Sequence, residues 1–228
     1  MHYLIHGDYH LQSRKFLTDL KQKAKTENKE IIELNGQILD LNQLIQATTS
    51  NSLFGAEKLI VIENLFSRLK SQAQEEILAW LKNYKGENPI IFWEKKGIGK
   101  ILQRKLPDKT LVKEFKTPVI IFKLVEILSP KNKKQALETL NQALVKEPAE
   151  FIFVMLARQM RILLMLKGNQ KITGAPWMIG KYKQQASFFE TEKLMALYQD
   201  LYKIDKQIKT GKTIMPLDWH LQIWMAGI

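Results

Sequence analysis

The sequence of 228 residues contains no cysteine, and this absence excludes several kinds of site at once. Disulfide bonds, thiolate nucleophiles and cysteine-ligated zinc or iron–sulfur centres all require a thiol. The chain also lacks an apolar run of the roughly 18 residues that a membrane span needs. Its longest apolar stretch, 151–166, is interrupted by Arg158, Gln159 and Arg161. No basic leader precedes an apolar core at the start, so we expect no signal peptide, no membrane partner and a cytoplasmic location.

Catalytic and metal-binding patterns are missing as well. No nucleophile, base and acid occur in a recognisable arrangement. His2, His6 and His10 are spaced by four residues, which on one helix would align three imidazoles for a metal ion. They straddle an apolar run and a glycine turn instead, so we expect no metal site. The sequence therefore predicts a protein that is not an enzyme by itself.

The first apolar run leads into Gly7, which invites comparison with a phosphate-binding loop. That loop requires the pattern G-x-x-x-x-G-K-[ST], because its glycines let backbone N–H groups surround the phosphates and its lysine neutralises them. Residues 7–15 contain no second glycine at the required place, and Asp8 adds negative charge where phosphates would lie. Gly-Lys sequences at 97–100 and 211–213 lack the leading glycine. We expect no bound nucleotide.

Positive charge is in excess, with 35 Lys and Arg against 23 Asp and Glu, a formal net charge of +12. Such an excess favours polyanionic partners, chiefly nucleic acid, or acidic protein surfaces. The alternative is a lysine-rich solubilising surface, because the lysines are scattered along the chain. Hydrophobic residues make up 45% of the sequence, which is typical of a folded domain.

The first half of the chain alternates short apolar runs with amphipathic segments. A helix is expected over 11–25, and Asp40 and Ser71 are suited to cap two more. Apolar strands followed by helices predict a parallel sheet that is covered on both faces. The expected strands are 3–6, 30–34, 58–63, 89–93 and 110–115.

From Val119 onward the apolar spacing is helical throughout. Gly211 is suited to end the fifth of the expected helices. We therefore expect an α/β domain over 1–117 and an all-helical domain over 118–228. The expected helices are 119–128, 131–145, 150–166, 176–189, 191–210 and 217–225.

The most informative segment is 48–64. Within a polar run it carries one isolated apolar pair, Leu53 and Phe54, followed by Gly55 and an apolar strand. An apolar pair in a loop is often a plug for the core of its own domain. Such an exposed apolar pair can also insert into an apolar pocket of a partner protein.

Several segments together resemble the delta subunit of bacterial DNA polymerase III, the clamp-loader component that opens the sliding clamp. They occur in the family's order in both halves of the chain. The matching segments are YLIHGD, SLFGAEKLIVIENL, IIFWEKK, IFKLVEIL, KKQALETLNQAL, FIFVMLARQMRILLMLK and LYKIDKQIKTGK.

The resemblance implies a P-loop-NTPase-like first domain of AAA+ type without a working phosphate loop, and a helical collar domain that joins the loader's ATPase subunits. ATP would bind those partner subunits and not this chain. The family's clamp-binding element maps onto Ser52, Leu53 and Phe54, with Asn51 where some relatives carry a hydrophobic residue. The family's helical lid domain is absent, because Phe115 leads almost directly into the collar-like segment.

The main hypothesis is therefore a minimal delta-type subunit that acts in DNA replication near the nucleoid and binds and opens the sliding clamp. Lys100, Arg104 and Lys105 are the candidate DNA-facing residues, with a solvated surface as the alternative. A second hypothesis is a basic DNA-binding scaffold protein that has the same fold without clamp loading. A third is an ATPase with an aberrant phosphate loop.

Overall fold

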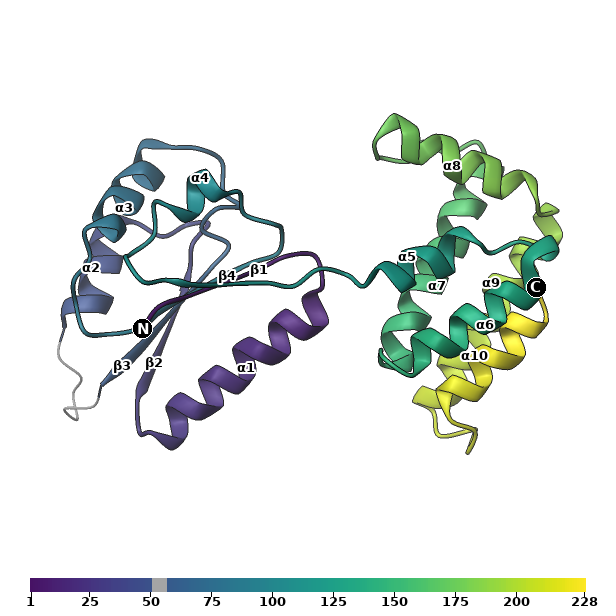
Figure 1. Ribbon diagram of the computed structural model, residues 1–228, viewed down its shortest axis with the longest axis horizontal. Helices are drawn as coiled ribbons and strands as arrows, with labels where there is room; N and C mark the ends of the chain where they lie inside the picture. Colours follow the sequence, from purple (N-terminus) through teal and green to yellow (C-terminus); the bar gives the residue numbers. More distant parts are fainter. Residues whose placement is uncertain (51–56) are drawn as a thin grey trace. The chain divides into compact units, whose positions relative to one another are not determined.

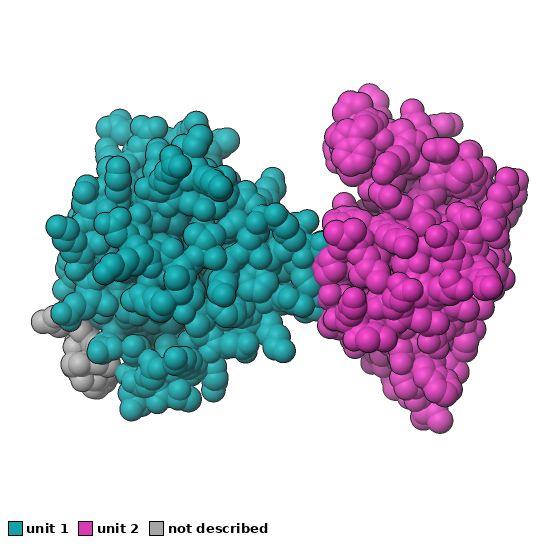
Figure 2. All heavy atoms as spheres, in the orientation of Figure 1, with its two compact units in different colours: residues 1–117 teal, residues 118–228 magenta. Residues whose placement is uncertain are grey.

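The computed structural model describes residues 1–50 and 57–228. The described chain divides into two compact units, Met1–Thr117 and Pro118–Ile228, which are coloured separately in Figure 2. Each unit has its own hydrophobic core. The chain passes from one unit to the other between the end of the last strand and the start of the first helix of the second unit.

The first unit is built on a five-stranded parallel sheet with the order β2-β3-β4-β1-β5. The central strands β3 and β4 are almost entirely buried, in agreement with their continuous apolar sequences. Both edge strands, β2 and β5, are much more exposed. The strands are β1 (Tyr3–His6), β2 (Glu30–Asn35), β3 (Lys58–Glu63), β4 (Ile90–Glu94) and β5 (Leu111–Glu114).

Helices cover both faces of this sheet, as Figure 1 shows. Helix α1 (His10–Thr26) packs on one face, where Leu17 belongs to the same buried apolar cluster as Ile5 and Val61. The other face is covered by α2 (Leu41–Thr49), α3 (Gln72–Lys82) and the short α4 (Lys100–Gln103). The alternation of side chains along each strand therefore supplies two separate apolar layers.

Two helix starts in this unit follow the capping expected from the sequence. Asp40 accepts a hydrogen bond from the Gln43 backbone N–H, and the Gln43 side chain accepts one from the Asp40 N–H, which completes a capping box. Ser71 caps α3 by accepting from the Gln74 N–H. Both contacts satisfy backbone groups that a helix leaves unpaired at its start.

The second unit is helical throughout. Its α9 ends in a Schellman motif, in which Gly211 has a positive φ of 64° and the Lys212 N–H donates to the Gln207 carbonyl. The predicted helix end at Gly211 is thus confirmed. The helices are α5 (Val119–Glu126), α6 (Lys133–Leu144), α7 (Ala149–Lys167), α8 (Pro176–Ser187), α9 (Thr191–Lys209) and α10 (Leu217–Ala226), with a short 3-10 turn, η1 (Pro130–Asn132), before α6.

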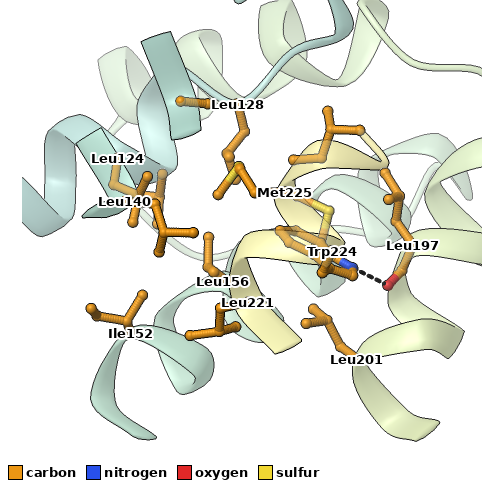
Figure 3. Close-up of a cluster of buried hydrophobic side chains, with 14 of the residues drawn as sticks. Leu124, Leu128, Leu140, Ile152, Leu156, Leu197, Leu201, Leu221, Trp224 and Met225 are labelled. Carbon is orange, nitrogen blue, oxygen red and sulfur yellow. Dashed lines mark hydrogen bonds between the residues drawn. The ribbon is translucent and has the colours of Figure 1, made fainter. Parts of the chain in front are cut away.

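The core of the helical unit brings α5, α6, α7, α9 and α10 together, as Figure 3 shows. Leu140, Leu156 and Met225 are fully buried there. The Trp224 indole N–H donates to the Leu197 carbonyl oxygen at 2.9 Å, so this large aromatic ring is buried without losing its polar contact. No helix in the described part of the chain is long and apolar enough to cross a membrane.

The observed fold confirms the expected class, a parallel α/β unit followed by a helical unit. One α-helix was not predicted from the sequence. Residues Lys100–Gln103 form the single-turn helix α4, which is too short to show helical spacing of apolar residues. Strand β5 and helix α5 are separated by residues 115–118 alone, so the described chain holds no helical lid between them.

Candidate functional site

The predicted clamp-binding residues Ser52, Leu53 and Phe54 lie outside the residues that the structure describes. The structure does describe both ends of the segment that contains them. Helix α2 ends at Thr49 and strand β3 begins at Lys58, so the segment joins a helix to the amino-terminal edge of the sheet, where the strands begin.

The first described feature at this edge is a buried lysine. Lys58 is 4% exposed, and its ammonium group donates to the Ser50 backbone carbonyl at 2.6 Å and to the Ser50 hydroxyl at 2.8 Å. Ser50 is the C-cap residue of α2. A cation at this position also interacts favourably with the carboxyl end of the helix. Lys58 thereby ties the residue that follows α2 to the first residue of β3.

Asn88 makes a second connection between the same two elements. Its side-chain N–H donates to the Thr48 carbonyl at 3.0 Å, and its side-chain oxygen accepts from the Lys58 backbone N–H at 3.2 Å. The Tyr84 hydroxyl donates to the Asn88 carbonyl at 3.3 Å. We call the set Ser50, Lys58 and Asn88 the stem clasp.

The first unit carries two grooves, and Ser50 and Lys58 of the stem clasp help to line one of them. One, of about 520 Å³, lies between β2 and α2, and its lining includes Ile32, Gln46, Ser50 and Lys58. The other, of about 300 Å³, lies beside the carboxyl end of α1 and is lined by Leu20, Lys29 and Leu59 among others. Both grooves mix apolar and charged side chains, a composition that suits contact with a protein partner.

The opposite edge of the sheet, where the strands end, carries the loop that follows β1. Gly7 has a φ of +126°, and a Cβ atom there would lie 2.0 Å from the Phe115 carbonyl oxygen. Glycine is therefore required by the close approach of β5 and the linker, and no phosphate is needed to explain it.

Several polar groups of this loop are engaged in hydrogen bonds within the unit. The Tyr9 N–H donates to the Phe115 carbonyl, the His10 N–H to the Asp8 carbonyl and the Ser13 N–H to the Tyr9 carbonyl. The Asp8 carboxylate accepts from the Thr117 backbone N–H at 2.8 Å. A phosphate-binding loop needs free N–H groups that converge on an anion, and these N–H groups are committed elsewhere.

Arg14, on helix α1, contacts strand-end residues at the same edge of the sheet. Its guanidinium makes a bidentate ion pair with Glu63, at 2.6 and 2.7 Å, and lies 3.4 Å from the centre of the Trp93 ring. Counted from Gly7, Arg14 stands where a phosphate loop carries the Ser or Thr that binds Mg²⁺, and P-loop NTPases hold that ion with a further strand-end carboxylate. Here a guanidinium neutralises the carboxylate at the end of β3, so these residues do not fit a Mg²⁺–nucleotide complex.

Two buried ionisable side chains lie on neighbouring strands at this edge. Glu94 is fully buried and accepts from the Phe66 N–H and the Ser67 hydroxyl, each at 2.8 Å; burial raises the pKa of Glu94 above its usual value. His6 accepts at Nδ1 from the Ile98 N–H, and burial lowers the pKa of His6. His6 Nε2 is buried without a partner among the described residues.

The three regularly spaced histidines do not converge. His2 accepts at Nδ1 from the Ile90 N–H, His6 contacts the loop after β4, and His10 contacts the Lys95 carbonyl at 2.8 Å. Each ring contacts a different backbone segment. In the described part of the chain no three His, Asp or Glu residues form a group that could hold a metal ion.

The candidate DNA-facing residues lie together on one short element. Lys100 begins α4, and Arg104 is its C-cap residue. Lys100 and Arg104 are exposed, whereas Lys105 is half-buried. Lys95 and Lys96, in the loop before α4, are also exposed. The basic residues of this segment therefore lie near one another at the strand-end edge.

Sequence reasoning missed the stem clasp and the Arg14–Glu63 pair. A signal was present for Arg14, because it occupies the last position of the phosphate-loop pattern counted from Gly7. No comparable signal marks Lys58, which resembles the other scattered lysines of a basic chain.

Comparison with known proteins finds a family match within the helical unit. The family model described as "DNA polymerase III delta subunit, C-terminal domain" matches residues 119–221. This match confirms, over the helical unit, the resemblance indicated by the sequence motifs. No curated protein sequence matches the chain significantly. Among solved structures, the Bacillus subtilis DNA clamp loader delta protein YqeN aligns with 98% of this chain and 94% of its own, at 13% identity and a TM-score of 0.48.

Proposed function

We propose that this chain, whose helical unit matches the C-terminal domain of the DNA polymerase III delta subunit, is a delta-type clamp-loader subunit that binds and opens the sliding clamp. The observation that carries the proposal is the family match over residues 119–221, which span nearly the whole helical unit. The first unit supplies the clamp contact, and the second joins the loader.

The proposed clamp contact is the pair Leu53 and Phe54, preceded by Ser52. Insertion of two such side chains into an apolar pocket contributes on the order of 3–6 kcal/mol before the cost of ordering is subtracted. Opening is mechanical in this proposal. The chain binds the open form of the clamp interface more tightly than the closed form, and the difference in affinity shifts the clamp toward opening.

ATP binding is assigned to partner subunits in this proposal. The Arg14–Glu63 pair and the hydrogen bonds donated by the Tyr9, His10 and Ser13 N–H groups support that assignment, because these groups are engaged within the unit. The chain is accordingly a non-catalytic subunit of a larger replication assembly, acting in the cytoplasm at the nucleoid.

The helical unit is proposed to bind the loader's ATPase subunits. Large apolar side chains are exposed on its last three helices, among them Trp177 on α8 and Trp219 and Ile223 on α10, each at least 59% exposed. Exposed aromatic and aliphatic side chains of this size are typical anchors of protein interfaces. Their number on one unit supports a role in assembly.

A second candidate function is direct DNA binding by the basic segment of the first unit. The supporting observation is the grouping of Lys95, Lys96, Lys100 and Arg104, all exposed, around α4. Contacts of this kind to phosphates are independent of base sequence and weaken steeply with salt. In a clamp loader these phosphate contacts would add affinity for DNA to the affinity for the clamp. In a protein without clamp-loading activity, DNA binding would be the whole function.

The deciding experiment is the binding of the purified chain to the sliding clamp of its own host, measured beside the double variant Leu53→Ala, Phe54→Ala. We expect binding by the unchanged chain and a loss of at least about 100-fold in the variant, because roughly 3 kcal/mol or more of apolar contact is removed. The melting temperatures of the two proteins should agree, which separates a lost contact from a lost fold.

Two other results would change the conclusion. Absence of clamp binding by the unchanged chain, together with salt-dependent binding to primed or single-stranded DNA, would favour the DNA-binding scaffold. Equal clamp affinity of the unchanged chain and the double variant would place the contact elsewhere on the protein. For the DNA-binding measurement, the variant to compare with the unchanged chain is the double substitution Lys100→Gln, Arg104→Gln.

A further inference from the structure

Strand β2 is the outermost strand on one side of the parallel sheet, and among the described residues it pairs with β3 alone. The Glu30 N–H donates to the Glu57 carbonyl at 2.9 Å, so the backbone groups of Glu30 point toward β3. In a strand the N–H and C=O of one residue point to the same side, and those of the next residue point to the opposite side. Three residues of β2 therefore direct their N–H groups away from the sheet: Ile31, Glu33 and Asn35.

We call these three residues the free side of β2. The Asn35 carbonyl accepts from the Ile38 N–H at 3.2 Å, so the free side ends where β2 ends. No other described strand engages the backbone groups of Ile31 and Glu33 or the Asn35 N–H. An extended peptide placed beside β2 would form main-chain hydrogen bonds with these groups, the mode of recognition known as β-augmentation.

A groove follows the same strand over its whole length. It has a volume of about 520 Å³ and lies between β2 and α2, and every residue of β2 except Ile31 contributes to its lining. Ile32 and Leu34 are the apolar residues of β2 in this lining, and Ile38, which is 78% exposed, extends it beyond the end of the strand. A strand added on the free side would direct every second side chain to this face of the sheet, where the groove could receive it.

The charges on β2 indicate which kind of strand fits. It carries two glutamates and no basic residue, although the chain as a whole has a net charge of +12. Glu33 pairs with Lys21 at 2.8 Å, whereas Glu30 forms no ion pair among the described residues. Opposite charges on neighbouring strands stabilise their pairing, and like charges weaken it. A second copy of β2 would add two more glutamates, so a peptide that carries Lys or Arg is the complementary partner.

We propose that the free side of β2 binds an extended peptide segment of a partner protein, which adds a sixth strand to the sheet. The segment places alternate apolar side chains in the groove between β2 and α2, and it presents a Lys or Arg beside Glu30. The main-chain hydrogen bonds supply affinity, and the groove and Glu30 supply the sequence preference. Binding at this site does not require the proposed clamp contact.

The probe is the acetylated and amidated heptapeptide Lys-Thr-Val-Thr-Val-Thr-Lys, which has this pattern in either strand direction. Amide NMR spectra of the isotopically labelled full chain, titrated with the peptide, give the dissociation constant. Amide hydrogen exchange of Ile31 and Glu33 should slow about tenfold when the free peptide is at ten times its dissociation constant, because only the unbound form exchanges freely. Exchange of Ile32, whose N–H points toward β3, should not change.

Glu33→Pro is the decisive variant. It removes the outward N–H and places a ring on the free side, and it keeps the bonds to β3, because proline is tolerated where the N–H of an edge strand faces solvent. We expect the affinity for the peptide to fall at least about tenfold. Glu33→Thr removes the same carboxylate but retains the N–H, so its affinity should stay within about twofold of that of the unchanged chain.

Val112→Pro supplies the matched control on the other edge strand. The Leu111 N–H donates to the His2 carbonyl, so the neighbouring Val112 directs its N–H away from β1. This variant should bind the peptide as the unchanged chain does. The peptide Glu-Thr-Val-Thr-Val-Thr-Glu tests the charge preference and should bind at least about threefold more weakly than the lysine peptide.

Several results would overturn the proposal. Absence of binding at millimolar peptide would do so, and so would equal affinity of Glu33→Pro and the unchanged chain. A concentration-dependent dimer that Glu33→Pro abolishes would assign the free side to a second copy of this chain. Equal or tighter binding of the glutamate peptide would overturn the choice of a basic partner. If Glu33→Pro does not fold, the exchange rates of Ile31 and Glu33 decide, and rates that the lysine peptide leaves unaltered overturn the proposal.

Discussion

The two edges of the sheet in the first unit hold their charged side chains in different contacts. At the edge where strands end, Arg14 pairs with Glu63, Asp8 accepts from Thr117, and Glu94 accepts from Ser67. At the edge where strands begin, the buried ammonium of Lys58 has neutral partners.

This difference indicates which edge is available for a partner. Groups that satisfy one another inside a unit contribute to its stability and leave little to offer a ligand. The loop after β1 is thus occupied by contacts within the unit, and we expect the clamp to bind at the other edge of the sheet.

The largest effect expected at the strand-end edge is that of Gly7→Ala. A Cβ at position 7 would overlap the Phe115 carbonyl, and the φ of +126° is unfavourable for any other residue. Unfolding free energy should fall by at least about 3 kcal/mol, or the first unit should not fold. Denaturant unfolding followed by tryptophan fluorescence measures this loss.

Gly99→Ala is the matched control for that substitution. Gly99 belongs to the same edge and has an ordinary φ of −68°, and a Cβ atom at this position would meet no other atom within 4 Å. Its variant should differ from the unchanged chain by no more than about 0.5 kcal/mol. Equal stability of the two variants would show that the close approach of the Phe115 carbonyl does not restrict the residue at position 7.

A smaller effect is expected when the charge pairing at this edge is broken. Arg14→Met removes the guanidinium from Glu63 and Trp93, and it should lower the free energy of unfolding by about 1–2 kcal/mol. Lys15→Met, an exposed neighbour on α1, should change it by no more than about 0.5 kcal/mol.

The unchanged chain and Arg14→Met also test whether this edge of the sheet binds nucleotide. Mg²⁺–ATP should leave the melting temperature of the unchanged chain and of Arg14→Met unaltered, because ligand binding to the native state alone would raise it. A rise for the unchanged chain would revive the ATPase hypothesis. A rise for Arg14→Met alone would show that the guanidinium is the single obstacle to nucleotide.

The contrast between the two edges also shows what the sequence could predict. Local patterns were sufficient for the strands, the caps at Asp40 and Ser71, and the helix end at Gly211, since each depends on residues close together in sequence. The incomplete phosphate-loop pattern was evident from the missing second glycine, and the expectation of no bound nucleotide stays a prediction. These are features that periodicity and turn chemistry describe directly.

The contacts that distinguish the edges were not predictable in the same way. Arg14 and Glu63 are 49 residues apart, and Asn88 and Thr48 are 40 residues apart. Their pairing depends on the strand order, which places β1, β3 and β4 side by side only after folding. Lys58 has no local signal that separates it from the other lysines. The clamp-binding assignment to Ser52, Leu53 and Phe54 remains a prediction.

The smallest expected effect concerns the pH dependence of the strand-end edge. Burial raises the pKa of Glu94, so the native state holds this proton more tightly than the unfolded state. The stabilising contribution of protonated Glu94 is fully present below the unfolded pKa and is lost as pH rises through the folded pKa. Glu94→Gln lacks this titration, and its amide can still accept from the Phe66 N–H and donate to the Ser67 hydroxyl.

The stability of Glu94→Gln relative to the unchanged chain should therefore increase as pH rises from the unfolded pKa of Glu94 to its folded pKa. His6 acts in the opposite direction, because its lowered pKa removes stability as pH falls below its unfolded value. His6 is present in both proteins, so the difference curve isolates Glu94. Denaturant unfolding from pH 4 to pH 8 provides the curve, with pH 4 near the usual glutamate pKa of about 4.3. A flat difference curve would mean that Glu94 is ionised as readily in the folded unit as in the unfolded chain. The edge where the strands end would then hold a buried carboxylate without a cationic partner, just as the opposite edge holds the buried ammonium group of Lys58.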